Sequence, residues 1–242
     1  MGNSIVEFGQ LSDAQKEEAV QLFLYGFGHF MTFSKDEDLK KKLFLEIFSP
    51  NLFFCYLEEN KVLGLMGLGT NKVRPIDFKK DICQKYFGKF KGSLISKQMN
   101  GIFQKQAVKD DNELYLDTLV THPDYRKMGI GTKLINKTSS FEDYTVLVTE
   151  VFSKNENAIS FYIRNGFTIV KKHKFSIMRL FGSGYPIVMV KELAWYLTIP
   201  LYCNYVMFIP YNITVIINMC TIIYITWITK YRKKGIILNF IP

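Results

Sequence analysis

The sequence has few residues of the kinds that build metal or disulfide sites. Among its 242 residues are four cysteines and three histidines. No two cysteines have C-x-x-C spacing, and no histidine lies at metal-ligand spacing from a cysteine. A Ser-His-Asp triad on a nucleophile elbow is missing as well. We therefore expect no metal site, and the sequence argues against a metalloenzyme or a serine hydrolase.

Acidic residues are missing from the last part of the chain. Every Asp and Glu lies at or before Glu192, and the residues after it supply four of the nine net positive charges. The rest of the chain is mildly basic, which suits an anionic ligand without implying nucleic acid. The start, MGNSIVEFGQ, is not a secretory signal, and Val6 stands where N-myristoylation requires Ser or Thr. We expect reduced thiols in a cytoplasmic domain.

Charge is absent altogether from residues 195–229, a stretch of 35 residues. It is long enough to cross a bilayer once, or twice as two short helices broken near Pro210. Trp195 and Trp227 lie at its ends like interfacial anchors, and the basic residues at 230–234 favour the cytoplasm for that end. A single span would place the preceding domain outside, whereas a hairpin keeps both ends inside. We therefore expect a hairpin.

The chain is thus expected to have three parts. A globular domain covers residues 1–193, a hydrophobic, helical membrane segment covers 194–229, and a basic tail covers 230–242. The alternative for the last two parts is an appended extension without a selected role. No internal repeat or low-complexity linker interrupts the first part.

Apolar periodicity predicts the order of elements in the globular domain. Ser12 and Gln15 have the spacing of a capping box at the start of a helix. Residues 58–61 join two alternating stretches as a tight hairpin. The expected elements are strands at 4–8, 51–57, 62–69, 173–181 and 185–190, a helix from Ser12, a helix at 35–48 and a helical stretch at 77–106.

The helical stretch at 77–106 interleaves lysines with aromatic residues. Basic and aromatic residues together suit a nucleic-acid surface or a membrane surface. A solvated lysine face over an aromatic core stripe explains the same pattern, and we expect that arrangement. Nucleic acid is not expected as a partner.

The most informative stretch is 114–136, LYLDTLVTHPDYRKMGIGTKLIN. Residues 114–120 read as a strand, 121–125 as a turn that contains proline, and 132–137 as a helix. Glycines before a helix let the backbone approach a ligand, and the helix dipole favours negative charge there. A P-loop is excluded because the Gly-x-x-x-x-Gly-Lys-Ser/Thr pattern is missing, and Leu134 replaces the third glycine of the dinucleotide fingerprint.

A second stretch, 147–167, reads LVTEVFSKNENAISFYIRNGF. Together the two stretches resemble motifs A and B of the GNAT acetyltransferase superfamily, R-x-x-G-x-G after a strand and N-x-x-A-x-x-Φ-Y-x-x-x-G-F. The resemblance covers about residues 4–193. It implies an α/β (α+β) fold with a mixed, mostly antiparallel central sheet, which is flanked by helices and splayed at the cofactor site.

The resemblance also implies where acetyl-CoA, the expected co-substrate, binds. The loop from Arg126 would hold the pyrophosphate through backbone N–H groups, and the strand before it would pair with the pantetheine arm. A backbone N–H on that strand could steady the developing oxyanion. Asn155 would contact the pantetheine, with turn capping as the alternative. The implied cofactor-binding residues are Leu119, Val120, Thr121, Arg126, Lys127, Met128, Gly129, Ile130, Gly131, Thr132, Asn155 and Tyr162.

The implied reaction is direct attack of a primary amine on the thioester in a ternary complex. Tyr162 matches the position that protonates the CoA thiolate, although a core tyrosine would fit the helix equally. Asp117 or Glu150 could take the proton of the amine through water if it faces the cleft, and otherwise each is an exposed carboxylate at a strand end. Tyr25, His29 and Phe30 are candidates for acceptor contact, with simple packing as the alternative.

A rival function uses the same residues without turnover. A non-catalytic acyl-CoA-binding or sensing module would keep Arg126, Gly129 and Gly131 and would not depend on Tyr162. The acceptor amine is not specified by these motifs, because the loops that build acceptor pockets in the resembling family vary freely.

Overall fold

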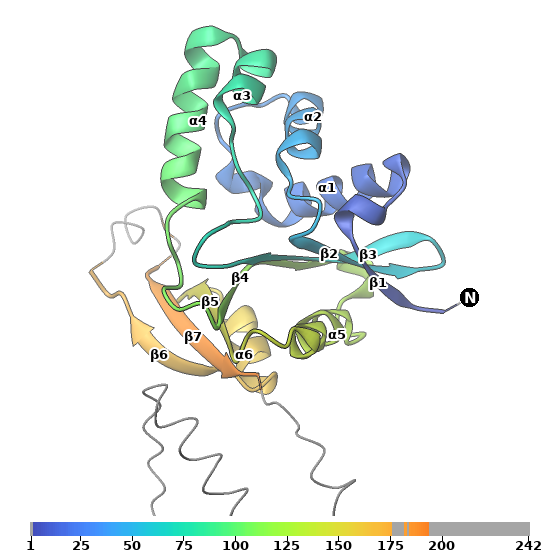
Figure 1. The fold of residues 1–242 in the computed structure, drawn as a ribbon, viewed down its shortest axis with the longest axis vertical. Coiled ribbons are helices and arrows are strands. Elements are labelled where there is room, and N and C mark those ends of the chain that lie inside the picture. The colour runs from blue at the N-terminus through green and yellow to red at the C-terminus, as the bar shows by residue number, and fades with distance from the viewer. Residues whose placement is uncertain (1, 176–181, 183, 194–242) are drawn as a thin grey trace, which may run out of the picture. The chain divides into compact units, whose positions relative to one another are not determined.

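The computed structural model describes residues 2–175, 182 and 184–193, all within one compact unit, Met1–Trp195 (Figure 1). The expected membrane segment, 194–229, and the basic tail, 230–242, lie outside the described residues. Within the described residues, no helix is both long enough and apolar enough to cross a membrane.

Seven strands form one sheet in the order β1-β2-β3-β4-β5-β7-β6. All neighbours are antiparallel except β4 and β5, which run parallel. The mixed, mostly antiparallel sheet expected from the sequence is confirmed. The strands are β1 (Ser4–Glu7), β2 (Phe53–Glu58), β3 (Lys61–Gly69), β4 (Glu113–Thr121), β5 (Val146–Phe152), β6 (Thr168–Lys172) and β7 (Pro186–Glu192).

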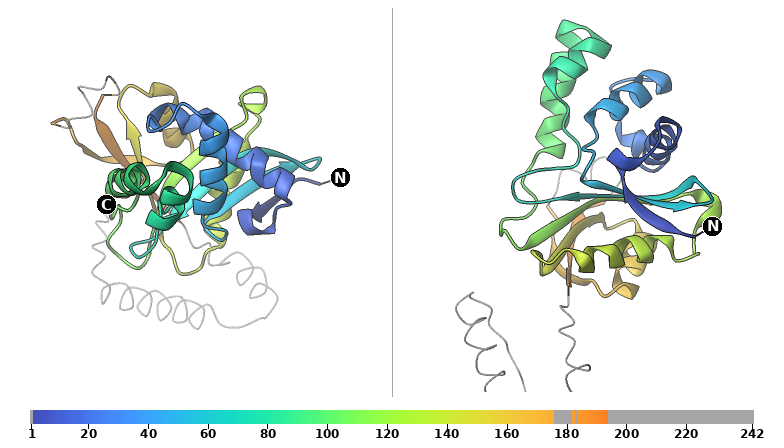
Figure 2. Two further views of the ribbon diagram at one scale, coloured as in Figure 1. Left: turned by 90° about the horizontal axis from the view of Figure 1, so that it is seen from above. Right: turned by 45° about the vertical axis from the view of Figure 1, so that its right-hand side comes forward.

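Helices cover both faces of this sheet, and Figure 2 shows α1 to α4 on one face with α5 and α6 on the other. Ser12 caps α1 with the predicted capping box, since its hydroxyl accepts from Gln15 N–H and the Gln15 side chain accepts from Ser12 N–H. The helices are α1 (Asp13–Phe27), α2 (Glu37–Ile47), α3 (Lys80–Phe87), α4 (Lys89–Phe103), α5 (Ile130–Lys137) and α6 (Glu156–Arg164).

Among the described residues, the two largest of three apolar clusters lie on the two faces of the sheet. The cluster that contains the buried residues of α1 and α2, called here the α1–α2 core, is rich in phenylalanine. Within it, Phe23 contacts both Phe44 and Phe48. The α5–α6 core contains Leu134 and Ile135 of α5, both fully buried. The sheet is therefore fixed from both sides, and α1 and α5 are held close to β3 and β4.

Two expected elements differ from the structure. Of the strand expected at 173–181, residues 173–175 are not in a strand and residues 176–181 lie outside the described residues; a strand that was not expected, β6, lies earlier, at Thr168–Lys172. Gly166, with φ +85°, ends α6 and lets the chain turn directly into strand pairing with β7. The helical stretch at 77–106 is two helices, since Gly88 separates α3 from α4 with φ +78°.

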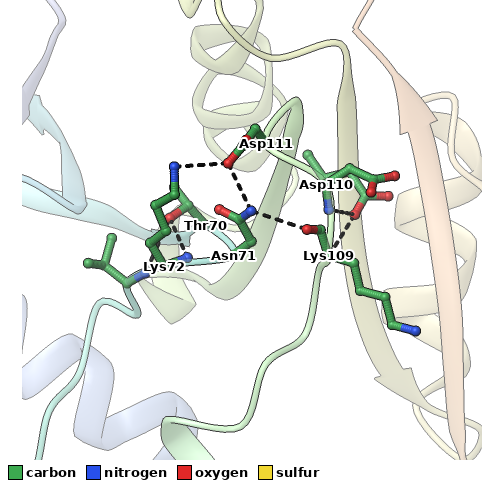
Figure 3. Close-up of polar contacts among 8 residues, drawn as sticks. Thr70, Asn71, Lys72, Lys109, Asp110 and Asp111 are labelled. Atoms are coloured by element: carbon green, nitrogen blue, oxygen red, sulfur yellow. Dashed lines mark hydrogen bonds and ion pairs between the residues drawn. The ribbon is translucent and has the colours of Figure 1, made fainter. Parts of the chain in front are cut away.

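The connection between β3 and β4 is unusually long for two adjacent antiparallel strands, which a two-residue turn can join. It runs from residue 70 to residue 112 and contains α3 and α4. Its two ends are tied together (Figure 3): the Asn71 side-chain amide donates to Lys109 O at 3.1 Å and to Asp111 Oδ1 at 3.0 Å, and Lys72 Nζ lies 2.9 Å from Asp111 Oδ1. This closure holds the segment that follows Lys72, in which Arg74 lies over the Tyr115 ring near the start of β4.

Candidate active site

The two parallel strands, β4 and β5, separate halfway along their length. Their register runs only from Glu113↔Val146 to Leu116↔Thr149. Beyond that point β4 still pairs with β3, and β5 still pairs with β7. The edges of β4 and β5 that face each other are therefore free of ladder pairing after Leu116 and Thr149. This splay is the feature expected at a site for acetyl-CoA.

A β-bulge in β4 lies at the start of the splay. Thr118 pairs with Gly67 and Leu116 pairs with Leu68, so Asp117 is an extra residue with no partner on β3. Leu116 and Leu119 both pack toward the α5–α6 core, at a spacing of three residues instead of two. A bulge bends a strand and re-aims its side chains, and such bulges are common beside active sites.

Residues 119–121 lie on β4 beyond the bulge. Leu119, Val120 and Thr121 pair with β3 on one side only. Their other backbone edge faces the splay, where an extended ligand with amide groups could be added as a strand. The structure thus places all three predicted residues along one edge.

The predicted pyrophosphate loop links β4 to α5. Its residues 126–129 are all exposed: Arg126, Lys127, Met128 and Gly129. Gly129 has φ +78° and directly precedes α5. The first-turn N–H groups of α5 have no acceptor within the helix, and no side chain caps them. A Cβ built on Gly129 would meet no atom within 4 Å, so the backbone there is open to a ligand. This arrangement fits a bound anion.

Ile130, Gly131 and Thr132 form the first turn of α5. Ile130 is buried, and a Cβ at Gly131 would lie 2.9 Å from the Phe161 ring of α6. Gly131 therefore allows α5 and α6 to pack closely, while its backbone remains in the anion-binding turn. The Thr132 side chain, unlike that of Ile130, is partly exposed.

Tyr162 of α6 is buried at the point where the strands separate. Burial raises the pKa of its phenol to about 12, and a hydrogen bond with Thr149 counters the shift. Thr149 is the last paired residue of β5, and its hydroxyl donates to Leu116 O at 3.0 Å. The phenol is therefore protonated at neutral pH and lies beside the hydroxyl that joins the two strands.

Asp117 is held by an arginine from the long β3–β4 connection. Arg74 Nη2 lies 2.8 Å from Asp117 Oδ1, and the two side chains are only 8% and 9% exposed. Arg74 also donates to Lys105 O and stacks over the Tyr115 ring. Burial raises the pKa of Asp117, and Arg74 counters this. The alternative of an exposed strand-end carboxylate is therefore wrong for Asp117.

Two buried atoms of this ion pair have no hydrogen-bond partner among the described residues. They are Asp117 Oδ2 and Arg74 Nε. A buried polar atom without a partner is uncommon and often marks the place of a water or ligand group. One oxygen of Asp117 thus remains free to accept a proton or a hydrogen bond.

Glu150 lies one residue past Thr149 on β5 and is exposed. Its charge raises the pKa values of both Asp117 and Tyr115, which places it near these two groups. The two candidate bases therefore lie near each other at the splay, one buried and one exposed.

Asn155, by contrast, caps α6, because its Oδ1 accepts from Ala158 N–H at 3.2 Å. The Asn155 side chain therefore has the turn-capping role that the sequence offered as the alternative to pantetheine contact.

The three candidate acceptor residues lie at two places around the site. His29 and Phe30 are in contact, and the Phe30 ring lies 6.1 Å from that of Phe152 at the end of β5. Tyr25 lies under the guanidinium of Arg126, 5.7 Å from ring centroid to Cζ. All three side chains are exposed. The end of α1 thus reaches both the splayed end of β5 and the pyrophosphate loop.

Sequence reasoning missed Arg74 and Thr149. A weak signal existed for the first, since Arg74 is the single arginine before Arg126 in a chain rich in lysine. Arginine is better suited than lysine to buried ion pairs. For Thr149 no signal was available, because a threonine within a strand is ordinary.

Comparison with known proteins agrees with this geometry. Residues 95–169 match the family model described as an acetyltransferase (GNAT) domain. The matched region contains both motifs, so the family resemblance is confirmed. No curated protein matches the sequence.

Solved structures show a similar fold at low sequence identity. The N-acetyltransferase from Staphylococcus aureus Mu50 is 17% identical with a TM-score of 0.53, and the match covers 77% of this chain and 99% of that chain. Ard1 from Thermoplasma volcanium is also 17% identical, with a TM-score of 0.48 and coverage of 80% and 99%. At such identity, the likeness to the first of these establishes the fold alone.

Proposed function

The chain carries a GNAT acetyltransferase domain, and we propose that it is an acetyl-CoA-dependent N-acetyltransferase that acts on a primary amine. The observation that carries the proposal is the splay between β4 and β5, with an anion-binding turn at one end and the Tyr162 phenol at its start. The splay would hold the pantetheine arm, the turn before α5 would hold the pyrophosphate, and Tyr162 would serve as the proton donor.

Acetyl-CoA would be held mainly by backbone groups. The free edge of residues 119–121 would pair with the amides of the pantetheine arm. The N–H groups at the start of α5 would face the pyrophosphate, with Arg126 adding positive charge nearby. An N–H near the bulge at Asp117 could stabilise negative charge on the thioester oxygen.

The reaction forms a C–N bond between the amine and the acetyl carbon and breaks the C–S bond to coenzyme A. The departing thiolate needs a proton, and Tyr162 remains protonated because its pKa is raised to about 12. The attacking nitrogen must first lose a proton, because an alkylammonium has no lone pair. Asp117 through its free Oδ2, or Glu150 from the exposed side, would receive that proton directly or through water. After the C–N bond has formed, the nitrogen loses a second proton, which balances the proton that Tyr162 gives to the sulfur.

The acceptor would approach from the α1 side of the sheet. Phe30 and His29 lie beside the end of β5, and Tyr25 lies beside Arg126. Asp117 and Glu150 are two carboxylates against the one guanidinium of Arg74. The excess negative charge would favour a cationic amine, in keeping with the proposed acceptor class.

The rival function is a non-catalytic acyl-CoA-binding module, and Tyr162→Phe separates the two. An enzyme should keep its affinity for acetyl-CoA and lose turnover by about 100-fold or more, because a general acid contributes at least that factor. A binding module should be unaffected. Turnover is measured as free thiol released from acetyl-CoA with a panel of amines, peptides and polyamines.

Tyr144→Phe is the matched control for that experiment. Tyr144 also packs against the α5–α6 core, so the control removes a phenol from the same core without touching the splay. If the chain binds acetyl-CoA but releases no thiol with any acceptor, the binding-module function replaces the enzyme.

We also propose, from sequence alone, that residues 195–229 associate with a membrane while the catalytic domain stays in the cytoplasm. The support is the absence of charge over this stretch and the basic residues that follow it. Flotation of the full chain with vesicles tests this. Release by high salt would contradict insertion of an apolar segment.

A further inference from the structure

The outward face of α4 carries a row of exposed apolar side chains. Phe90 is 91% exposed, Leu94 is 55% exposed and Ile102 is 66% exposed. Another side of the helix packs inward, with Ile95 and Met99 in the α1–α2 core. In Figures 1 and 2, α4 extends away from the sheet together with α3. The helix therefore has a second apolar face that the fold itself does not bury among the described residues.

The stretch of chain that contains this face carries charge of one sign. Residues 82–109 contain six lysines and no acidic residue. On α4 itself, Lys91 and Lys97 are exposed and lie three positions on either side of Leu94. At 100° per residue, this spacing puts one lysine about 60° to each side of Leu94. Phe90 lies about 40° from Leu94 on the side of Lys97, and Ile102 lies about 80° away on the side of Lys91. The face thus combines exposed apolar side chains with two exposed lysines.

This arrangement differs from the lysine-covered face expected from the sequence. For α3 that expectation is correct, since Tyr86 and Phe87 pack against the α1–α2 core. For α4 it is wrong, because Phe90 lies outside the core. Gly88, with φ +78°, turns the chain between the two helices. The residues of α4 that face the core are therefore not those that would face it in an unbroken helix continuing α3.

The combination of lysines with apolar side chains favours an anionic lipid bilayer over a nucleic acid as the partner of this face. Lysines next to a surface attract anionic headgroups, and apolar side chains in a row enter the boundary between headgroups and acyl chains. A nucleic acid would satisfy the lysines but would offer no apolar surface to Leu94 and Ile102. Residues 195–229 of the same chain, free of charge, add a separate sequence argument for a bilayer nearby.

We propose that α4 docks on the surface of an anionic lipid bilayer. Phe90, Leu94 and Ile102 enter the boundary below the headgroups, and Lys91 and Lys97 lie against anionic lipid. This inference is independent of acetyl transfer, since none of these residues belongs to the splay or to the pyrophosphate loop.

The test uses the full chain with a single indole as a depth probe. Trp195→Phe and Trp227→Phe remove the two native tryptophans, and Phe90→Trp then places one on α4. Vesicles of phosphatidylcholine with brominated phosphatidylglycerol should quench emission from position 90. The matched control is Ile163→Trp in the same background, because Ile163 is also an exposed apolar side chain, 53% exposed, and lies on α6. Its emission should not change.

Two further variants separate α4 from any anchoring by the end of the chain. Lys91→Gln with Lys97→Gln should weaken the quenching response by on the order of fivefold for each lysine removed, and added salt should weaken it further. Lys171→Gln with Lys172→Gln, two exposed lysines on β6, should leave it unchanged. The proposal fails if the chain binds vesicles without quenching at position 90, if it does not bind them, or if RNA changes the emission and vesicles do not.

Discussion

Arg74 Nη2 lies 2.8 Å from Asp117 Oδ1, in an ion pair that joins the long β3–β4 connection to the bulge of β4. The arginine is fixed by Lys105 O and by the Tyr115 ring, so its position depends on the closure of residues 70–112. The pair therefore links the long β3–β4 connection to the strand that lines the proposed site.

Removal of either member of this pair should destabilise the fold strongly. Arg74→Ala or Asp117→Ala leaves one buried charge without its partner, and we expect a loss of about 3–5 kcal/mol in the free energy of unfolding. Urea denaturation measures it. The double variant Arg74→Met with Asp117→Leu removes both charges and should lose less than either single variant. Equal and additive losses would show that the two side chains act separately.

The pH dependence of Tyr162 should differ from that of an exposed tyrosine. Its pKa is raised to about 12 by burial, above the value near 10 of the unfolded chain. Its contribution to stability is therefore fully present below pH 10 and is lost as the pH rises through the folded pKa.

Absorbance of tyrosinate in the full chain, minus that of Tyr162→Phe, reports this group alone. The difference should titrate near pH 12, or appear abruptly where the protein unfolds in alkali. A smooth midpoint near pH 10 in the folded protein would contradict a buried phenol at the splay.

Thr149 should matter to both stability and ligand binding. Its hydroxyl donates to Leu116 O at the last paired position of β4 and β5. Thr149→Val keeps the shape and leaves a buried carbonyl without its donor, at a cost of about 1–3 kcal/mol. Because this bond joins the strands where they separate, the variant should also bind acetyl-CoA more weakly.

Thr138→Val is the matched control for that prediction. The Thr138 hydroxyl also donates to a backbone carbonyl, that of Ile135, and is fully buried away from the splay. Both variants should lose similar stability in thermal denaturation. If both variants also lose the same affinity for acetyl-CoA in calorimetry, the weaker binding of Thr149→Val follows from its lower stability. In that case the Thr149 hydrogen bond has no specific role at the splay.

The sequence predicted the parts of the fold that rest on local signals. Period-two alternation located β2, β3 and β4, and the tight turn at Glu59 and Asn60, both with positive φ, joins β2 and β3 as expected. The glycine spacing at 129 and 131 predicted a turn that leads into a helix, and Gly129 does precede α5 with positive φ. These features follow from residues close together in the chain, which is why pattern reading found them.

Other parts depend on contacts between distant residues. Asp117 meets Arg74 across 43 positions of sequence, and only the folded connection between β3 and β4 brings them together. The exposed face of α4 depends on the turn at Gly88, since an unbroken helix would have presented a different side. The position of β6 was missed because its five residues are all exposed and show no alternation. Tertiary context decides each of these.

The central claim, that the turn before α5 holds the pyrophosphate of acetyl-CoA, is tested most directly by calorimetric titration of the full chain. Gly129 has φ +78°, a conformation that Asn and Asp both tolerate, so Gly129→Asn and Gly129→Asp differ mainly in charge. If the site is real, the native chain and Gly129→Asn bind acetyl-CoA, and Gly129→Asp binds at least about tenfold more weakly because its carboxylate repels the pyrophosphate. Equal affinity of the two variants, or no binding by the folded native chain, would contradict the proposed site.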